Sequence, residues 1–237
     1  MLIKLFLLNL LILGCTGLTP AQDDKVIVDE SKLPRLADAV ETFVPAGWTI
    51  EEQISGDLNN DSTPDVALKI TEKKSANATE DDPVSRERVL MILFKNADNK
   101  FERVATVDGL LQCTGCGGAF FGVVEAPADV KINKGVLIVE QESGSRNVTE
   151  TTFRFRYDPV VKKFTLIGYD AVDRDRATGE IVSNSSNFLT GVKITEIYQY
   201  NQKLDKQQLK SKHQTKIAKA PQYLEDIDYE KIGDDAE

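Results

Sequence analysis

The stretch TTFRFRYD, residues 151–158, alternates strictly between two kinds of side chain. Thr151, two phenylalanines and Tyr157 fall on one side of an extended chain, whereas Arg154 and Arg156 fall on the other. Because successive side chains of a β-strand point to opposite faces of the sheet, this alternation predicts a half-buried strand. We expect its two arginines to lie in solvent rather than to bind a ligand.

Apolar, β-branched runs recur on both sides of this stretch. Short strands separated by turn signals such as ADNK (97–100) are typical of antiparallel sheets. The fold class we predict is therefore mainly β, with antiparallel hairpins in a single domain. The run RVLMILFKN (88–96) is apolar on both faces, which predicts a central strand. The other runs are DVALKIT (65–71), FERVATVD (101–108), GVLIVEQE (135–142), KKFTLIGYD (162–170) and GVKITEIYQYN (191–201).

One segment departs from this pattern. In SKLPRLADAVETFVPAGW, residues 31–48, the apolar positions follow the spacing of one helical face: Leu36, Val40, Phe43 and Val44. Pro34 suits a first helical turn, and a second proline followed closely by glycine suits the end of a helix. The sequence therefore predicts one N-terminal helix beside the strands.

The beginning of the chain has the form of a secretory signal peptide, which we place at residues 1–21. Lys4 precedes an apolar run, Leu5–Leu13, that is too short to span a bilayer. Two cleavage sites remain open: before Cys15 of the lipobox-like ILGC, which would leave a lipidated cysteine, or after Ala21. In either case we expect an exported protein, periplasmic or a membrane-anchored lipoprotein.

Charge divides the rest of the chain. The 237 residues carry a formal net charge of −9, which argues against a nucleic-acid-binding surface because such surfaces need clustered basic residues. We expect a β-rich domain over residues 22–220. Its last part, 201–220, carries six lysines against one aspartate and suggests a solvated strand. The final segment, 221–237, carries seven acidic residues and predicts a frayed acidic tail.

The run SGDLNNDSTPDVAL, residues 55–68, has the spacing of a calcium-binding loop. Calcium takes six to eight oxygen ligands, and a loop with a ligand at every second residue can wrap them around the ion. Because the side chains carry about three negative charges, they attract a dication and repel one another without it. The candidate ligands are the side chains of Asp57, Asn59, Asp61 and Asp65 and the backbone carbonyl of Thr63.

This loop resembles the FG-GAP/VCBS-type repeat, whose core is Asp-x-Asn/Asp-x-Asp-Gly-x-x-Asp followed by an apolar strand. The resemblance implies a loop that joins two strands of a propeller-type blade and binds structural Ca²⁺. Two differences matter: Ser62 replaces the usual glycine at a sharp turn, and no second copy of the motif occurs. An EF-hand is excluded because Leu68 stands where that site needs a glutamate. A turn whose aspartates cap backbone amides remains the alternative.

Cys113 and Cys116 form a CxxC pair in LLQCTGCGGAFFG. A pair of cysteines in an exported protein indicates a disulfide, here one that fixes the shape of a glycine-rich loop. A zinc site would need about four ligands, but the sequence has one histidine, His213, and no second CxxC. A thioredoxin-like redox role would need the pair at the N-terminus of a helix within a βα unit, and a run of glycines is a poor start for a helix.

Signatures of catalysis are scarce. A single histidine leaves no catalytic triad, and no phosphate-binding motif is present. The leading hypothesis is a non-enzymatic binding module with a structural calcium loop, whose partner is a protein or polysaccharide of the cell envelope. It would contact a membrane only through a lipid on Cys15. The alternatives are an envelope hydrolase with structural calcium and unidentified catalytic carboxylates, and a thiol–disulfide protein that uses Cys113 and Cys116.

Overall fold

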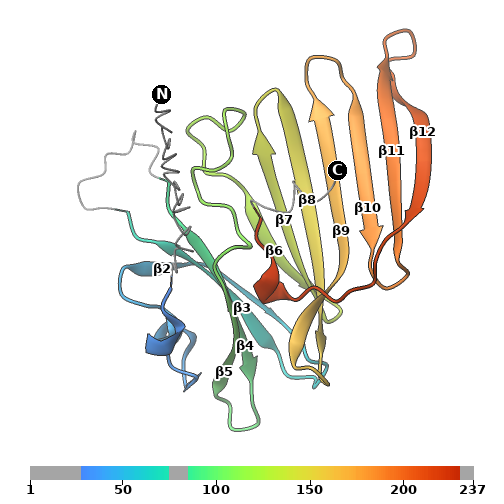
Figure 1. The fold of residues 1–237 in the computed structure, drawn as a ribbon. Coiled ribbons are helices and arrows are strands. Elements are labelled where there is room, and N and C mark those ends of the chain that lie inside the picture. Colours follow the sequence, from blue (N-terminus) through green and yellow to red (C-terminus); the bar gives the residue numbers. More distant parts are fainter. Residues whose placement is uncertain (1–27, 75–84, 230–237) are drawn as a thin grey trace, which may run out of the picture.

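A computed structural model describes residues 28–74 and 85–229, in which the chain forms two antiparallel β-sheets (Figure 1). The predicted signal peptide, with Cys15 and Ala21, lies outside the described residues. The described part contains no α-helix and no closed propeller or barrel. The predictions of a mainly β fold and of antiparallel sheets are therefore confirmed, whereas these described residues do not form a propeller.

The first sheet has five strands in the order β1-β5-β4-β3-β2. They are β1 (Leu36–Ala37), β2 (Trp48–Gly56), β3 (Asp65–Glu72), β4 (Arg88–Lys95) and β5 (Phe101–Val107). Strand β4 lies between β3 and β5, and its residues 88–93 are buried, so the prediction of a central strand is confirmed. One face of this sheet packs against the second sheet, and the other is covered by residues near the start of the described chain.

The second sheet has seven strands in the order β12-β11-β10-β9-β8-β7-β6. They are β6 (Ala128–Asn133), β7 (Val136–Gly144), β8 (Asn147–Asp158), β9 (Lys163–Asp175), β10 (Ile181–Asn187), β11 (Val192–Asn201) and β12 (Lys206–Lys216). In β8, Phe153 and Phe155 are fully buried in the core between the sheets, and Arg156 is exposed. The half-buried strand predicted from alternation is confirmed. Arg154 is partly buried and pairs with Asp170 at 2.6 Å.

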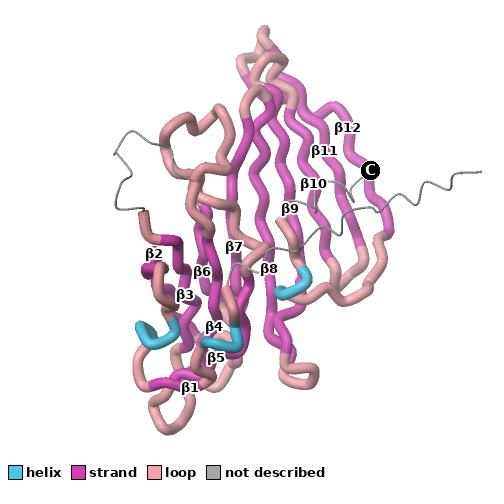
Figure 2. Tube along the Cα trace, turned by 60° about the vertical axis from the view of Figure 1, so that its left-hand side comes forward, coloured by secondary structure: helices cyan, strands magenta, loops and turns pink. Residues whose placement is uncertain are grey.

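The last three strands extend beyond the first sheet as a single layer (Figure 2). No residue of β10, β11 or β12 is buried, and every residue of β12 except Ser211 is exposed. The solvated strand predicted within residues 201–220 is therefore confirmed. Lysines along an exposed edge strand oppose pairing with another chain, and β12 carries Lys206, Lys210, Lys212 and Lys216.

The predicted N-terminal helix is wrong. Residues 31–48 instead contain the 3₁₀-helical turn η2 (Val40–Phe43) and strand β1, after a first 3₁₀ turn, η1 (Glu30–Lys32). Strand β1 (Leu36–Ala37) pairs with β5, so these residues are extended and cannot be part of a helix. Val40 and Phe43 are buried against the first sheet, so the apolar spacing that indicated a helical face serves a 3₁₀ turn, in which residues three apart align.

The expectation of a frayed tail does not hold for residues 221–229. Leu224, in the 3₁₀ turn η3 (Leu224–Asp226), is fully buried, and Ile227 is 5% exposed; both join the core between the sheets. Backbone hydrogen bonds hold the segment in place, from Leu166 N to Gln222 O (2.8 Å) and from Tyr229 N to Gly109 O (2.7 Å). The acidic side chains predicted a solvated segment, but the apolar residues between them, Leu224 and Ile227, bury it against the core.

Candidate functional site

The aspartate-rich loop joins β2 to β3 as a hairpin loop, with Gly56 paired to Asp65 across its base. Its Leu58 is fully buried in the core between the two sheets, which anchors the loop from inside. Asn60 and Ser62 have positive φ, 62° and 69°. Ser62 thus adopts the left-handed conformation for which glycine is usual, as the comparison with the repeat motif implied.

The first three candidate ligands are held together by hydrogen bonds within the loop. The two oxygens of Asp57 accept from the backbone amides of Asp61 (3.2 Å) and Ser62 (2.9 Å). Asp61 accepts from the amide of Thr63 at 2.7 Å and from the side-chain amide of Asn59 at 3.0 Å. The hydrogen bond from Thr63 lowers the pKa of Asp61, so its carboxylate stays ionised.

Asp65 lies apart from these three, because its side chain faces the interior. It is fully buried, and its oxygens accept from the amides of Leu58 (2.9 Å) and Lys95 (3.0 Å). Burial raises the pKa of Asp65; these two hydrogen bonds oppose the rise, and the negative charge of Asp61 adds to it. Asp65 therefore ties the loop to the end of β4.

The loop also touches the second sheet. A Cβ added at Gly56 would lie 2.5 Å from a side-chain carbon of Ile132 in β6, so only glycine fits there. At the turn between β6 and β7, a Cβ added at Gly135 would lie 3.0 Å from the side-chain oxygen of Asn60. The loop is thus placed where the two sheets meet, and its conformation affects both of them.

The residue types of this loop suit calcium, but their side chains are not arranged around a common point as in a formed metal site. Carboxylate, amide and carbonyl oxygens are the ligands that calcium prefers. However, residues 28–74 and 85–229 contain no group of three or more His, Cys, Asp or Glu side chains placed to hold a metal ion. The contacts described above are those of the alternative interpretation, an aspartate-rich turn that caps backbone amides. The five predicted ligands therefore remain a prediction.

The carboxylates of this loop also lack basic partners. In the part of the chain that the structure describes, no ion pair involves Asp57, Asp61 or Asp65. Each hydrogen-bonded carboxylate oxygen keeps a second lone pair. The loop therefore concentrates negative charge that only backbone and side-chain amides offset, and a bound cation would relieve the repulsion between the aspartates.

Ser62→Gly tests the conformational cost at this turn. Serine at a φ of 69° is disfavoured by its Cβ, whereas glycine is not. We expect the substitution to raise the free energy of unfolding by about 0.5–1 kcal/mol, measured by urea denaturation without metal. Ser183→Gly, within β10, serves as a control and should destabilise. A loss of stability in Ser62→Gly would show that the serine side chain contributes more than its backbone strain costs.

A network of buried cations, which the sequence did not reveal, lies beside the β2 strand. The side chains of Lys69 and Arg88 are only 7% and 3% exposed. Arg88 forms a two-pronged ion pair with Glu51 (2.9 and 3.0 Å), and Lys69 pairs with Glu51 (3.4 Å) and Glu52 (3.1 Å). A β-bulge at Glu51, where the register with β3 shifts, lets both consecutive glutamates reach Lys69.

The same network connects the first sheet to the segment that leads into the second. Arg88 donates to the carbonyl of Ala126 at 2.8 Å, and Lys69 donates to that of Ala128 at 2.8 Å. Burial by itself would raise the pKa of Glu51, but the hydrogen bond and positive charge of Arg88, with the charge of Lys69, outweigh it and lower the pKa. The sequence signal for this network was a basic residue within each of two apolar strands, Lys69 in β3 and Arg88 in β4. The signal did not identify their partners, because these are distant in sequence.

The structure joins Cys113 and Cys116 in a disulfide within a turn-rich loop. The loop contains no helix, as the glycine run suggested. Backbone hydrogen bonds fix it to its neighbours, from Thr114 N to Arg86 O (2.9 Å) and from Gly144 N to Gly117 O (2.9 Å). His213 lies on β12, and the described residues bring no histidine or cysteine cluster together that would suit zinc.

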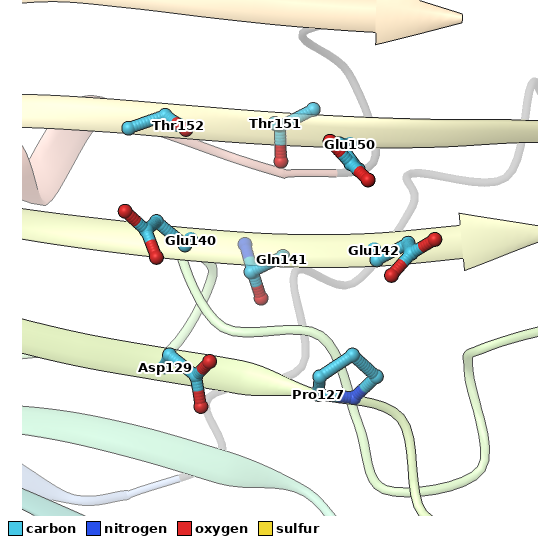
Figure 3. Close-up of a pocket in the computed structure, with 8 residues that line it drawn as sticks. All are labelled: Pro127, Asp129, Glu140, Gln141, Glu142, Glu150, Thr151 and Thr152. Atoms are coloured by element: carbon cyan, nitrogen blue, oxygen red, sulfur yellow. The ribbon is translucent and has the colours of Figure 1, made fainter. Parts of the chain in front are cut away.

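The outer face of the second sheet carries a shallow hollow of about 340 Å³. Figure 3 shows four carboxylates around it, on three adjacent strands: Asp129, Glu140, Glu142 and Glu150. Glu140 pairs with Lys131, and Glu150 pairs with Arg174. Two of the four carboxylates around the hollow are thus engaged in ion pairs with basic side chains.

Comparison with known proteins adds no relative. No family model matches the chain, and neither a curated protein nor a solved structure does. The resemblance to the FG-GAP/VCBS motif therefore rests on the residues of the loop alone. Over the two described ranges, no helix is long and apolar enough to cross a membrane.

Proposed function

We propose that this protein is an exported, non-catalytic binding module in which Ca²⁺ stabilises the loop between β2 and β3. The observation that carries the proposal is the set of three carboxylates, Asp57, Asp61 and Asp65, held within nine residues and without a basic partner in the described part of the chain. Asn59 and the carbonyl of Thr63 complete the proposed oxygen ligands. The secretory form of the first residues supports export.

In this proposal the ion acts by organising the loop before a partner binds. It would neutralise Asp57 and Asp61, whose positions are already restricted by the amides of Asp61, Ser62 and Thr63. Since the loop contacts both β4 and the turn between β6 and β7, the ion would stabilise the junction of the two sheets. The proposed partner is a protein or polysaccharide of the cell envelope.

Calcium titration of the metal-free protein tests the ion. We expect the melting temperature to rise, because a ligand at about 100 times its Kd stabilises the folded state by about 2.7 kcal/mol. Asp57→Asn and Asp61→Asn keep the side-chain shape and should lose most of this rise. Asp98→Asn, in the exposed turn between β4 and β5, is the matched control and should keep it.

Two outcomes would reject parts of the proposal. An unchanged melting temperature in saturating calcium, together with no heat of binding by calorimetry, would leave the loop as a capped turn without metal. For the binding role, incubation with isolated envelope polysaccharide should retain the protein on the polymer without cleaving it. Release of new reducing ends would instead identify a hydrolase.

A further inference from the structure

The two cysteines of the CxxC loop differ sharply in their surroundings. Cys113 is 6% exposed, whereas Cys116 lies on the surface. The hydroxyl of Ser85 lies 2.7 Å from the sulfur of Cys113. Because a disulfide sulfur carries no proton, Ser85 must be the donor of this hydrogen bond. A thiolate that approaches from solvent therefore reaches Cys116 first. In such an attack Cys113 Sγ would be the leaving group, and the Ser85 hydroxyl lies beside it.

Apolar side chains on the same loop are exposed. Phe120, Val123 and Val124 are 41%, 82% and 67% exposed. The ring of Phe121 packs over Gly117, the residue that follows Cys116: a Cβ added at Gly117 would lie 2.8 Å from that ring. Exposed apolar side chains grouped in this way are typical of contact surfaces. An apolar segment of a partner would thus be held next to the exposed residue Cys116.

The loop is held in this arrangement before any partner arrives. The amide of Phe120 donates to the carbonyl of Gly144 at 2.9 Å, and the amide of Ala126 donates to that of Thr114 at 2.8 Å. The guanidinium of Arg176 lies 4.8 Å from the ring centre of Phe120, which fixes that ring from the side of the second sheet. A preorganised surface loses less conformational entropy on binding.

From these features we propose that the Cys113–Cys116 disulfide exchanges with cysteine-containing apolar peptides, and that Cys116 is the sulfur attacked. This role goes beyond calcium-supported binding and does not depend on it. The thiolate of the peptide forms a bond with Cys116 Sγ, the bond between the two protein sulfurs breaks, and its electron pair leaves with Cys113 Sγ. The peptide sulfur is oxidised in this step, and Cys113 is reduced to a thiolate.

Ser85 is a positioning residue for this step. Its hydroxyl donates a hydrogen bond that becomes stronger when Cys113 acquires a full negative charge. A second thiol on the same peptide can then attack the peptide sulfur of the mixed disulfide. That attack gives an oxidised peptide and a thiolate on Cys116, so the peptide dithiol is the reductant for both protein cysteines.

The test uses the oxidised protein and a short synthetic peptide with one cysteine between leucine and phenylalanine. We expect a mixed disulfide that peptide mapping by mass spectrometry places on Cys116. A peptide of equal length with serine and aspartate around its cysteine should react several-fold more slowly. Val123→Asn combined with Val124→Asn should remove this preference, while circular dichroism checks that the variant is folded.

Single-residue variants separate the proposed role from a purely structural one. Ser85→Ala should slow exchange about three- to tenfold, whereas Ser183→Ala on β10 should not change it. In Cys113→Ser the remaining Cys116 thiol should react with a disulfide probe at least about tenfold faster than Cys113 does in Cys116→Ser. Absence of the mixed disulfide in the folded wild type, or its formation on Cys113, would overturn the proposal. Loss of the calcium effect would leave it unchanged.

Discussion

Replacing Glu51 with alanine is expected to lower the free energy of unfolding by about 3 kcal/mol. The substitution leaves Arg88 without its two-pronged partner and removes one of the two carboxylates near Lys69. Because both cations are almost completely buried, the loss of this carboxylate leaves their positive charges poorly compensated. Urea denaturation followed by circular dichroism measures the change.

The neighbouring glutamate provides the matched control. Glu52 is 46% exposed and pairs only with Lys69 among the ion pairs of the described chain, so Glu52→Ala should cost less than about 1 kcal/mol. If Glu51→Ala and Glu52→Ala lower the free energy of unfolding equally, burial of the cations does not determine the effect. The loss would then come from a general weakening of β2.

The contribution of Glu51 should also depend on pH in a defined direction. Its pKa is lower in the folded protein than in the unfolded chain, because Arg88 and Lys69 stabilise its ionised form against the cost of burial. The stabilisation is therefore complete above the unfolded pKa and is lost as the pH falls through the folded pKa. The difference in unfolding free energy between the wild type and Glu51→Gln should decrease below about pH 4.

Replacing Leu58 with alanine is the second large change that we expect. Leu58 is fully buried between the sheets, and its loss should cost about 3 kcal/mol through the lost apolar contacts and the cavity left behind. The backbone amide of residue 58 still donates to Asp65 in this variant, but the buried side chain that anchors the loop between the proposed ligands is lost. We therefore expect weaker calcium binding in calorimetry as well as lower stability.

An exposed leucine distinguishes this effect from a general one. Leu189 is 56% exposed, and Leu189→Ala should change neither stability nor calcium affinity appreciably. If Leu58→Ala is less stable but binds calcium as tightly as the wild type, calcium affinity does not depend on the buried side chain of Leu58. In that case the proposed link between the core and the site would be wrong.

The strands were predictable because their signals are local. In β8 the alternation of phenylalanine with arginine directly reports which face is buried, and in β4 the unbroken apolar run reports burial on both faces. The segment around Val40 and Phe43 misled because spacing of three residues fits an α-helix and a 3₁₀ turn equally well. Pairing of β1 with β5, between residues far apart in the chain, decided between them.

The candidate site was predictable only in its composition. The sequence placed Asp57, Asp61 and Asp65 in one loop between strands, and the left-handed turn at Ser62 follows the motif. The inward direction of Asp65 was not predictable, because its partner amide on Lys95 is 30 residues away. The contacts of Lys69 and Arg88, with partners 59 and 37 residues away, were hidden for the same reason.

The burial of Leu224 and Ile227 between the two sheets has a consequence for how the molecule is made. These residues follow all the strands of ranges 28–74 and 85–229, yet they complete the core that Leu90, Phe153 and Leu166 share. A nascent chain that has emerged only as far as β12 has all of its strands but cannot close that core. The core between the sheets can therefore be completed only after synthesis has passed residue 227.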